Sequence, residues 1–148
     1  MGTHVDESIE IARPAGDVAR YMFDWRNDPR WIGGISEARL ATDGDFGVGS
    51  RVERVASFLG KRIEYVLEVE DYQPGALLAM RSVRAPFPMA VAYEVSDTRD
   101  GARARVRVDG DASGFYRLAG PLLNLQAARA IAADLRRLKA LLEAEERG

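Results

Sequence analysis

The chain has 148 residues, 47% of them hydrophobic, and its 21 basic and 23 acidic side chains give a formal net charge of −2. This length predicts one domain over residues 1–148, and the near-neutral charge excludes a global field that would attract nucleic acid or an anionic membrane. The sequence has no cysteine, no signal peptide and no apolar run of about 20 residues, so we expect a cytoplasmic protein without disulfides, thiolate chemistry or integral membrane association.

The N-terminal segment predicts one strand followed by two short helices. Apolar side chains mostly alternate with polar ones over residues 5–11, which indicates a strand. Pro14 stands where a helix can begin, and apolar residues recur at helical spacing over 18–25. Pro29 interrupts this spacing, and a second short helical turn is expected to carry Trp31 before two glycines end it.

The middle of the chain predicts an antiparallel sheet. Six further strands are expected at residues 36–41, 50–59, 62–72, 77–84, 89–96 and 102–110. Glycines at positions 60, 75 and 101 predict tight reversals between the later strands. Strands joined this tightly must be antiparallel, because a parallel pair needs a crossover of about a dozen residues or more.

The C-terminal segment changes to a helical period. Leucines and alanines recur at intervals of three and four over residues 121–146, which predicts one long amphipathic helix that covers the apolar face of the sheet. The fold class is therefore α+β, with about seven strands. The predicted core contains Ile11, Val18, Met22, Val69, Val91, Val106, Leu125, Leu135 and Leu138.

The hairpin at Gly60 orients the side chains of its two strands. If the loop has two residues, the face with Val52, Arg54, Ala56 and Phe58 joins the apolar face with Ile63, Tyr65, Leu67 and Val69. A loop of one or three residues would place Glu53 on that face instead. We favour Arg54, because its companions are more apolar.

The order of these elements resembles the helix-grip fold of the START-like, polyketide cyclase/dehydrase group, also called SRPBCC. The resemblance is carried by residues 11–18 at the first strand-to-helix junction, Asp24 followed by Trp31, residues 47–50, residues 71–74 and residues 134–139. It implies a curved antiparallel sheet wrapped around the long helix, with a cavity for hydrophobic ligands between them. Members range from transport proteins to cyclases, so the fold alone does not decide function.

Several residues are candidates for contact with a ligand in such a cavity. They are Trp31, Arg54, Tyr65, Met80, Tyr93, Phe115, Leu118, Leu122 and Gln126. Arg54 would anchor a carboxylate, phenolate or carbonyl, or it would lie at the cavity rim with its head in water. Tyr65 and Tyr93 would each orient the ligand through the hydroxyl or fill the core. Trp31 would line the chamber or plug it. Gln126 would reach the ligand or stay solvated. Small alanines around residue 130 would leave volume for a guest.

These residues favour binding over catalysis. The only histidine, His4, is expected to be a solvated terminal residue, and no metal or other cofactor is expected. We predict a carrier or sensor of a hydrophobic or amphipathic small molecule, acting as a monomer or weak homodimer without nucleic acid. The alternatives are a cyclase or dehydratase that uses cavity tyrosines and Arg54, and a module that binds a protein partner.

The start of the long helix suggests where a ligand would enter. Gly120 and Pro121 interrupt the helical pattern, so residues 115–120 are expected to form a separate turn. Phe115 and Leu118 would then lie at the mouth of the cavity. This turn and the loop at residues 85–88 are the predicted portal.

Overall fold

The computed structural model describes residues 2–147, so positions 1 and 148 of the predicted domain lie outside the described residues. In chain order the elements are β1 (Thr3–Ile11), α1 (Ala15–Met22), η1 (Trp25–Asn27), α2 (Asp28–Trp31), β2 (Ile35–Leu40), β3 (Arg51–Phe58), β4 (Lys61–Gln73), β5 (Leu77–Arg84), β6 (Met89–Thr98), β7 (Gly101–Gly110), α3 (Ser113–Tyr116) and α4 (Gly120–Arg147). The predicted order of strands and helices is confirmed.

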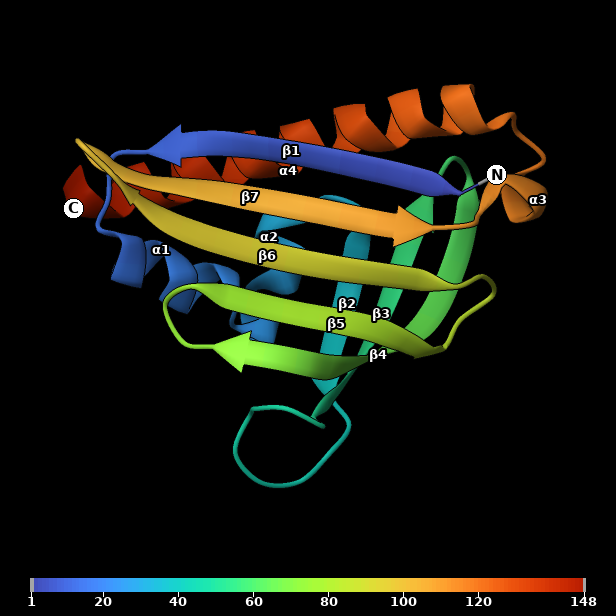
Figure 1. The fold of residues 1–148 in the computed structure, drawn as a ribbon, viewed down its shortest axis with the longest axis horizontal. Coiled ribbons are helices and arrows are strands. Elements are labelled where there is room, and N and C mark those ends of the chain that lie inside the picture. Colours follow the sequence, from blue (N-terminus) through green and yellow to red (C-terminus); the bar gives the residue numbers. More distant parts are fainter. Residues whose placement is uncertain (1, 148) are drawn as a thin grey trace.

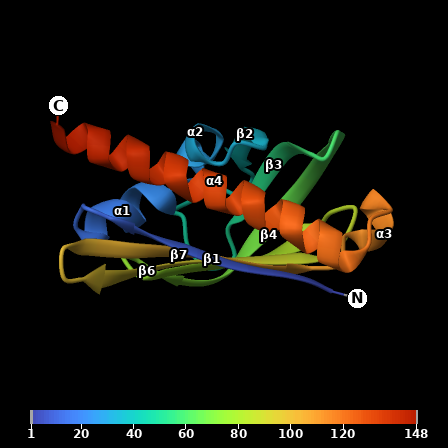
Figure 2. The ribbon, with the colours of Figure 1, turned by 90° about the horizontal axis from the view of Figure 1, so that it is seen from above.

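All seven strands form one antiparallel sheet in the order β1-β7-β6-β5-β4-β3-β2. The sheet curls, and α1, α2 and α4 lie on the same side of it (Figures 1 and 2). Helix α4 runs along this side and contacts β1 most extensively. The predicted α+β helix-grip architecture is therefore confirmed.

The glycines at the predicted turns are needed for two different reasons: a positive φ at Gly60 and Gly75, and a close approach of another backbone at Gly101. Leu59 and Gly60 both have positive φ, 51° and 80°, and form a two-residue loop, the first of the alternatives considered. Gly75 has a φ of 87°, as its predicted turn demands. Gly101 pairs with Thr98 across the third reversal, but no side chain fits there, because a Cβ at Gly101 would lie 2.2 Å from a backbone oxygen of β1.

The core agrees with the predicted set except at one position. Of the nine predicted core residues, Leu125 alone is wrong, because 45% of it is exposed. A repeat of 3.6 residues counted back from the buried Leu138 reaches Ala127 and Leu123 rather than Leu125. Leu123 is 1% exposed and takes the core position.

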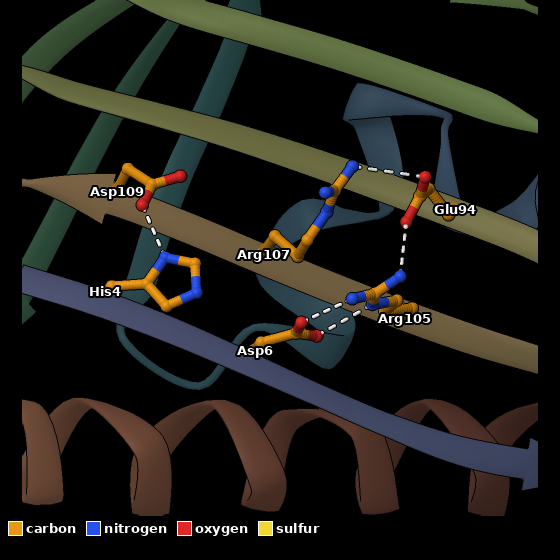
Figure 3. Close-up of polar contacts among 6 residues, drawn as sticks. All are labelled: His4, Asp6, Glu94, Arg105, Arg107 and Asp109. Carbon is orange, nitrogen blue, oxygen red and sulfur yellow. Dashed lines mark hydrogen bonds and ion pairs between the residues drawn. The ribbon is translucent and has the colours of Figure 1, made fainter.

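The outer face of β1, β7 and β6 carries a network of alternating charges (Figure 3). Arg105 pairs with Asp6 on β1 and with Glu94 on β6, and Arg107 donates to Glu94 at 3.1 Å. The arginines of β7 face outward, as the strand period predicts, and their acidic neighbours balance their charge. Exposed pairs of this kind contribute little stability each.

His4 belongs to strand β1 rather than to a frayed terminus. Its backbone N–H donates to the Asn124 side chain at 3.2 Å, which ties the start of β1 to α4. Its ring lies against Asp109 on the outer face, as Figure 3 shows, and both side chains are exposed. The side chain is exposed, as expected, but the residue belongs to the sheet instead of a loose terminus.

Candidate ligand-binding cavity

A cavity of about 240 Å³ lies between the concave face of the sheet and α4. Its walls are mostly apolar, with Ile63 from β4, Val91 from β6 and Val106 from β7. On the α4 side Ala127 and Ala130 face the cavity. Two of the alanines in the predicted helix therefore border the cavity, and their small side chains leave space above the concave sheet.

Arg54 lies on the concave face of the sheet, which is the face that a two-residue loop at Gly60 predicts for it. It lies opposite Tyr65 in the register of β3 and β4 and is only 4% exposed. Its Nε and Nη2 lie 3.0 Å and 2.8 Å from Oδ2 of Asp28, and Nη2 also donates to the Tyr93 hydroxyl at 3.1 Å. The wet position at the cavity rim is excluded, because the guanidinium is buried and paired inside the protein.

The partner of Arg54 is Asp28, which the sequence reasoning missed. Asp28 is the first residue of α2 and is 1% exposed. In the sequence, the Asp-Pro pair predicts only a break in a helix. A buried arginine needs an acidic partner, but the sequence offers many acids and does not indicate which one the curled sheet brings to Arg54.

Burial and charge determine how this cluster ionises. Burial raises the pKa of Asp28, and the attraction of Arg54 opposes this rise. Burial disfavours a charged Arg54, yet Asp28 and the tyrosine hydroxyls more than compensate and raise its pKa well above the usual value. Burial also raises the pKa of Tyr65, and that of Tyr93 to about 12. At neutral pH both phenols therefore keep their protons and can donate hydrogen bonds.

Trp31 lines the cavity and is itself buried. It ends the single turn of α2, is 1% exposed and packs edge-on against Tyr93, with 5.6 Å between ring centroids. Among the described residues its indole Nε1 has no hydrogen-bond partner. Of the two roles considered for this residue, the position of Trp31 on the wall agrees with lining.

The other candidates fall into two groups. Tyr65 and Tyr93 lie on the cavity wall together with Trp31 and Arg54. Outside the wall lie Met80, Phe115, Leu118, Leu122 and Gln126. Met80 is 2% exposed and belongs to the core cluster that includes Phe23, from the helical segment after β1.

The start of α4 is rotated relative to the prediction. Leu122 is 53% exposed, and its neighbour Leu123 lines the cavity instead. In the preceding turn, Tyr116 lines the cavity rather than Phe115. The period of the apolar residues could have indicated Leu123, but only if the phase had been counted from the buried C-terminal half of α4.

An aromatic cluster, which we define as Phe58, Phe87, Phe115 and Tyr116, borders the cavity, and all of its members except Phe115 line the wall. The Phe87 ring lies 5.4 Å from Phe115 and 6.0 Å from Tyr116, and Phe58 packs edge-on against Tyr116. Lys61 donates to the Phe115 carbonyl at 2.6 Å. The cluster joins the two segments of the predicted portal, residues 85–88 and 115–120. The predicted separate turn exists, but α3 covers Ser113–Tyr116 rather than residues 115–120. Arg117 follows it with a φ of 54°, and α4 begins at Gly120.

The chain belongs to the family described as polyketide cyclase / dehydrase and lipid transport, whose sequence profile matches residues 2–143. This confirms the resemblance seen in the sequence. A search among curated proteins finds no match. None of the helices that the structure describes is long and apolar enough to cross a membrane.

Solved structures of other proteins share this fold. A START superfamily protein from Mycobacterium smegmatis aligns with a TM-score of 0.81 at 14% identity, over 95% of this chain and 97% of that one. The ZhuI aromatase/cyclase from Streptomyces sp. R1128 aligns with a TM-score of 0.73 at 19% identity, over 99% and 96% of the two chains. At these identities the likeness shows the fold alone.

Proposed function

We propose that this chain binds a hydrophobic or amphipathic small molecule in the cavity between the sheet and α4 and acts as its carrier or sensor. The observation that carries the proposal is the apolar cavity of about 240 Å³ with one buried polar cluster on its wall. In that cluster Asp28 and Tyr93 already engage Arg54. A guest can therefore enter without leaving a buried charge unpaired.

The volume limits the size of the guest. A cavity of roughly 150 Å³ accommodates benzene, so 240 Å³ suits one or two rings, or a short acyl chain. A longer molecule would not fit within this volume. We also propose that the protein is cytoplasmic and a monomer or weak homodimer, which fractionation and light scattering would test.

Binding is tested by thermal stability with a series of small ring compounds. A ligand present at about 100 times its dissociation constant stabilises the folded state by about 2.7 kcal/mol. Ala127→Met fills the cavity from α4 and should abolish the shift, whereas Ala144→Met, on an exposed part of the same helix, should preserve it. Equal binding by both variants would place the ligand outside the cavity.

A second candidate function is cyclisation or dehydration of a polyketide chain. The specific observation in its favour is that Arg54 and two protonated tyrosines lie on one wall, where they could polarise a carbonyl. Product analysis with a poly-β-keto thioester mimic tests this function. Turnover by the wild type and its loss in Tyr65→Phe, with tetralin binding retained, would establish the enzyme over the carrier.

A further inference from the structure

The described residues contain four buried side-chain polar atoms without a hydrogen-bond partner, and three of them belong to residues of the cavity wall. These three are Oγ1 of Thr3, Nε1 of Trp31 and the hydroxyl of Tyr116. Thr3 and Trp31 are 8% and 1% exposed, so both are more than nine-tenths buried. An unpaired buried polar group costs about 1–3 kcal/mol, and its concentration around one cavity indicates that a guest supplies the missing partners.

The three residues belong to two separate parts of the cavity wall. Thr3 begins β1 beside the N-terminus, and Tyr116 ends α3, which lies at the same end of the molecule in Figures 1 and 2. Trp31 belongs to α2, nearer the middle of the sheet, where Tyr93 contacts its ring. Apolar residues such as Val91 and Val106 line the wall.

The chemistry of the unpaired atoms defines what each part of the wall can bind. An indole N–H only donates, so the part at Trp31 needs an acceptor oxygen. The hydroxyls of Thr3 and Tyr116 each donate and accept. A ligand hydroxyl at that part could donate to one of them and accept from the other.

Charge excludes an anionic group on the ligand. The charged residues on the described wall are Arg54 and Asp134, and each already has an opposite partner, Asp28 at 2.8 Å and Arg137 at 3.2 Å. A ligand carboxylate would compete with Asp28 for the same guanidinium and leave one buried carboxylate uncompensated. The sequence suggested a ligand carboxylate, phenolate or carbonyl as the group near Arg54, and only the carbonyl is neutral.

Resting on the function proposed above, we propose that the ligand is a neutral molecule of one or two rings with a carbonyl-type acceptor at Trp31 and a hydroxyl at the part of the wall formed by Thr3 and Tyr116. These three residues determine specificity. They select two polar groups on an otherwise apolar guest.

The test compares four bicyclic probes by calorimetry: tetralin, tetralone, a hydroxytetralone with its hydroxyl para to the carbonyl, and tetralin carboxylate. Each new hydrogen bond to an unpaired buried atom should tighten binding about fivefold. Tetralone should therefore bind about fivefold tighter than tetralin, and hydroxytetralone about fivefold tighter again. The carboxylate should bind more weakly than tetralone.

Matched variants assign each step to its residue. Trp31→Phe should remove the preference for tetralone over tetralin, and Thr3→Val or Tyr116→Phe should remove the preference for the added hydroxyl. Tyr72→Phe deletes a hydroxyl away from the cavity wall and should change neither preference. Urea unfolding checks the fold, and Thr3→Val should be at least as stable as the wild type without ligand, because it removes an unpaired hydroxyl.

The outcomes separate the two proposals. If none of the four probes binds, the proposed function fails. If tetralin binds the wild type as tightly as tetralone and hydroxytetralone do, the cavity is a binding site, but the proposed recognition of polar groups by Trp31, Thr3 and Tyr116 is wrong. Tighter binding of the carboxylate than of tetralone would overturn the neutral ligand, whatever the variants show.

Discussion

The buried pair of Arg54 and Asp28 should respond very differently to loss of one partner and loss of both. The two side chains are 4% and 2% exposed and 2.8 Å apart. With an effective dielectric constant of about 20, their attraction is on the order of 6 kcal/mol before the cost of desolvation is subtracted. That cost consumes most of the attraction, so the pair adds little net stability, whereas a lone buried charge is strongly destabilising.

We therefore expect Asp28→Asn to lower the free energy of unfolding by about 3–5 kcal/mol at pH 7. Arg54 cannot relieve the loss by deprotonation, because its pKa lies well above the usual value. Arg54→Met should cost less, because burial raises the pKa of Asp28 and the lone carboxyl can take up a proton. This cost should shrink as the pH falls.

A double-mutant cycle measured by urea unfolding tests the argument. The double variant should be less destabilised than the sum of the single variants by about 2–3 kcal/mol. The exposed pair Arg39 and Glu53, on the neighbouring strand pair, is the control, and its coupling should stay below about 1 kcal/mol. A cost under about 1 kcal/mol for Asp28→Asn, or additive single effects, would refute the reasoning.

Three further predictions follow from other parts of the molecule. Gly101→Ala should destabilise the protein by about 1–3 kcal/mol in urea unfolding, because the new Cβ meets the Ile11 carbonyl. The control Gly16→Ala, in open space within α1, should stabilise the protein by about 0.5–1 kcal/mol. Equal effects of the two substitutions would contradict the steric argument. Burial raises the pKa of Asp134 above its ordinary 3.8, so the stability of the wild type relative to Asp134→Asn should fall as the pH rises from 3.8 through the folded pKa and then level off. A rise over that interval would mean that the pKa is lowered. Amide exchange over residues 115–120 should be fast without ligand and slow with hydroxytetralone bound, whereas uniform protection in both states would place the portal elsewhere.

Local pattern determined most of the architecture. Strand alternation has a period of two, so the sequence reduced the charged residue of the concave face to Arg54 or Glu53 and favoured Arg54 for its apolar companions. The two-residue loop at Leu59 and Gly60 confirms Arg54. The separate turn before α4 was likewise predictable from Gly120 and Pro121, because a proline cannot continue a preceding helix.

Only the tertiary structure decided which residues surround the cavity. The partner of Arg54 is 26 residues away on another element, and the curl of the sheet selects Asp28 from many acids. Met80 shares the concave face, yet it belongs to the core cluster that includes Phe23, from the helical segment after β1. Leu123 replaces Leu125 because the packing of the long helix fixes its rotation. Local periodicity assigns side chains to a face, whereas the packing of distant elements determines which part of that face encloses a cavity.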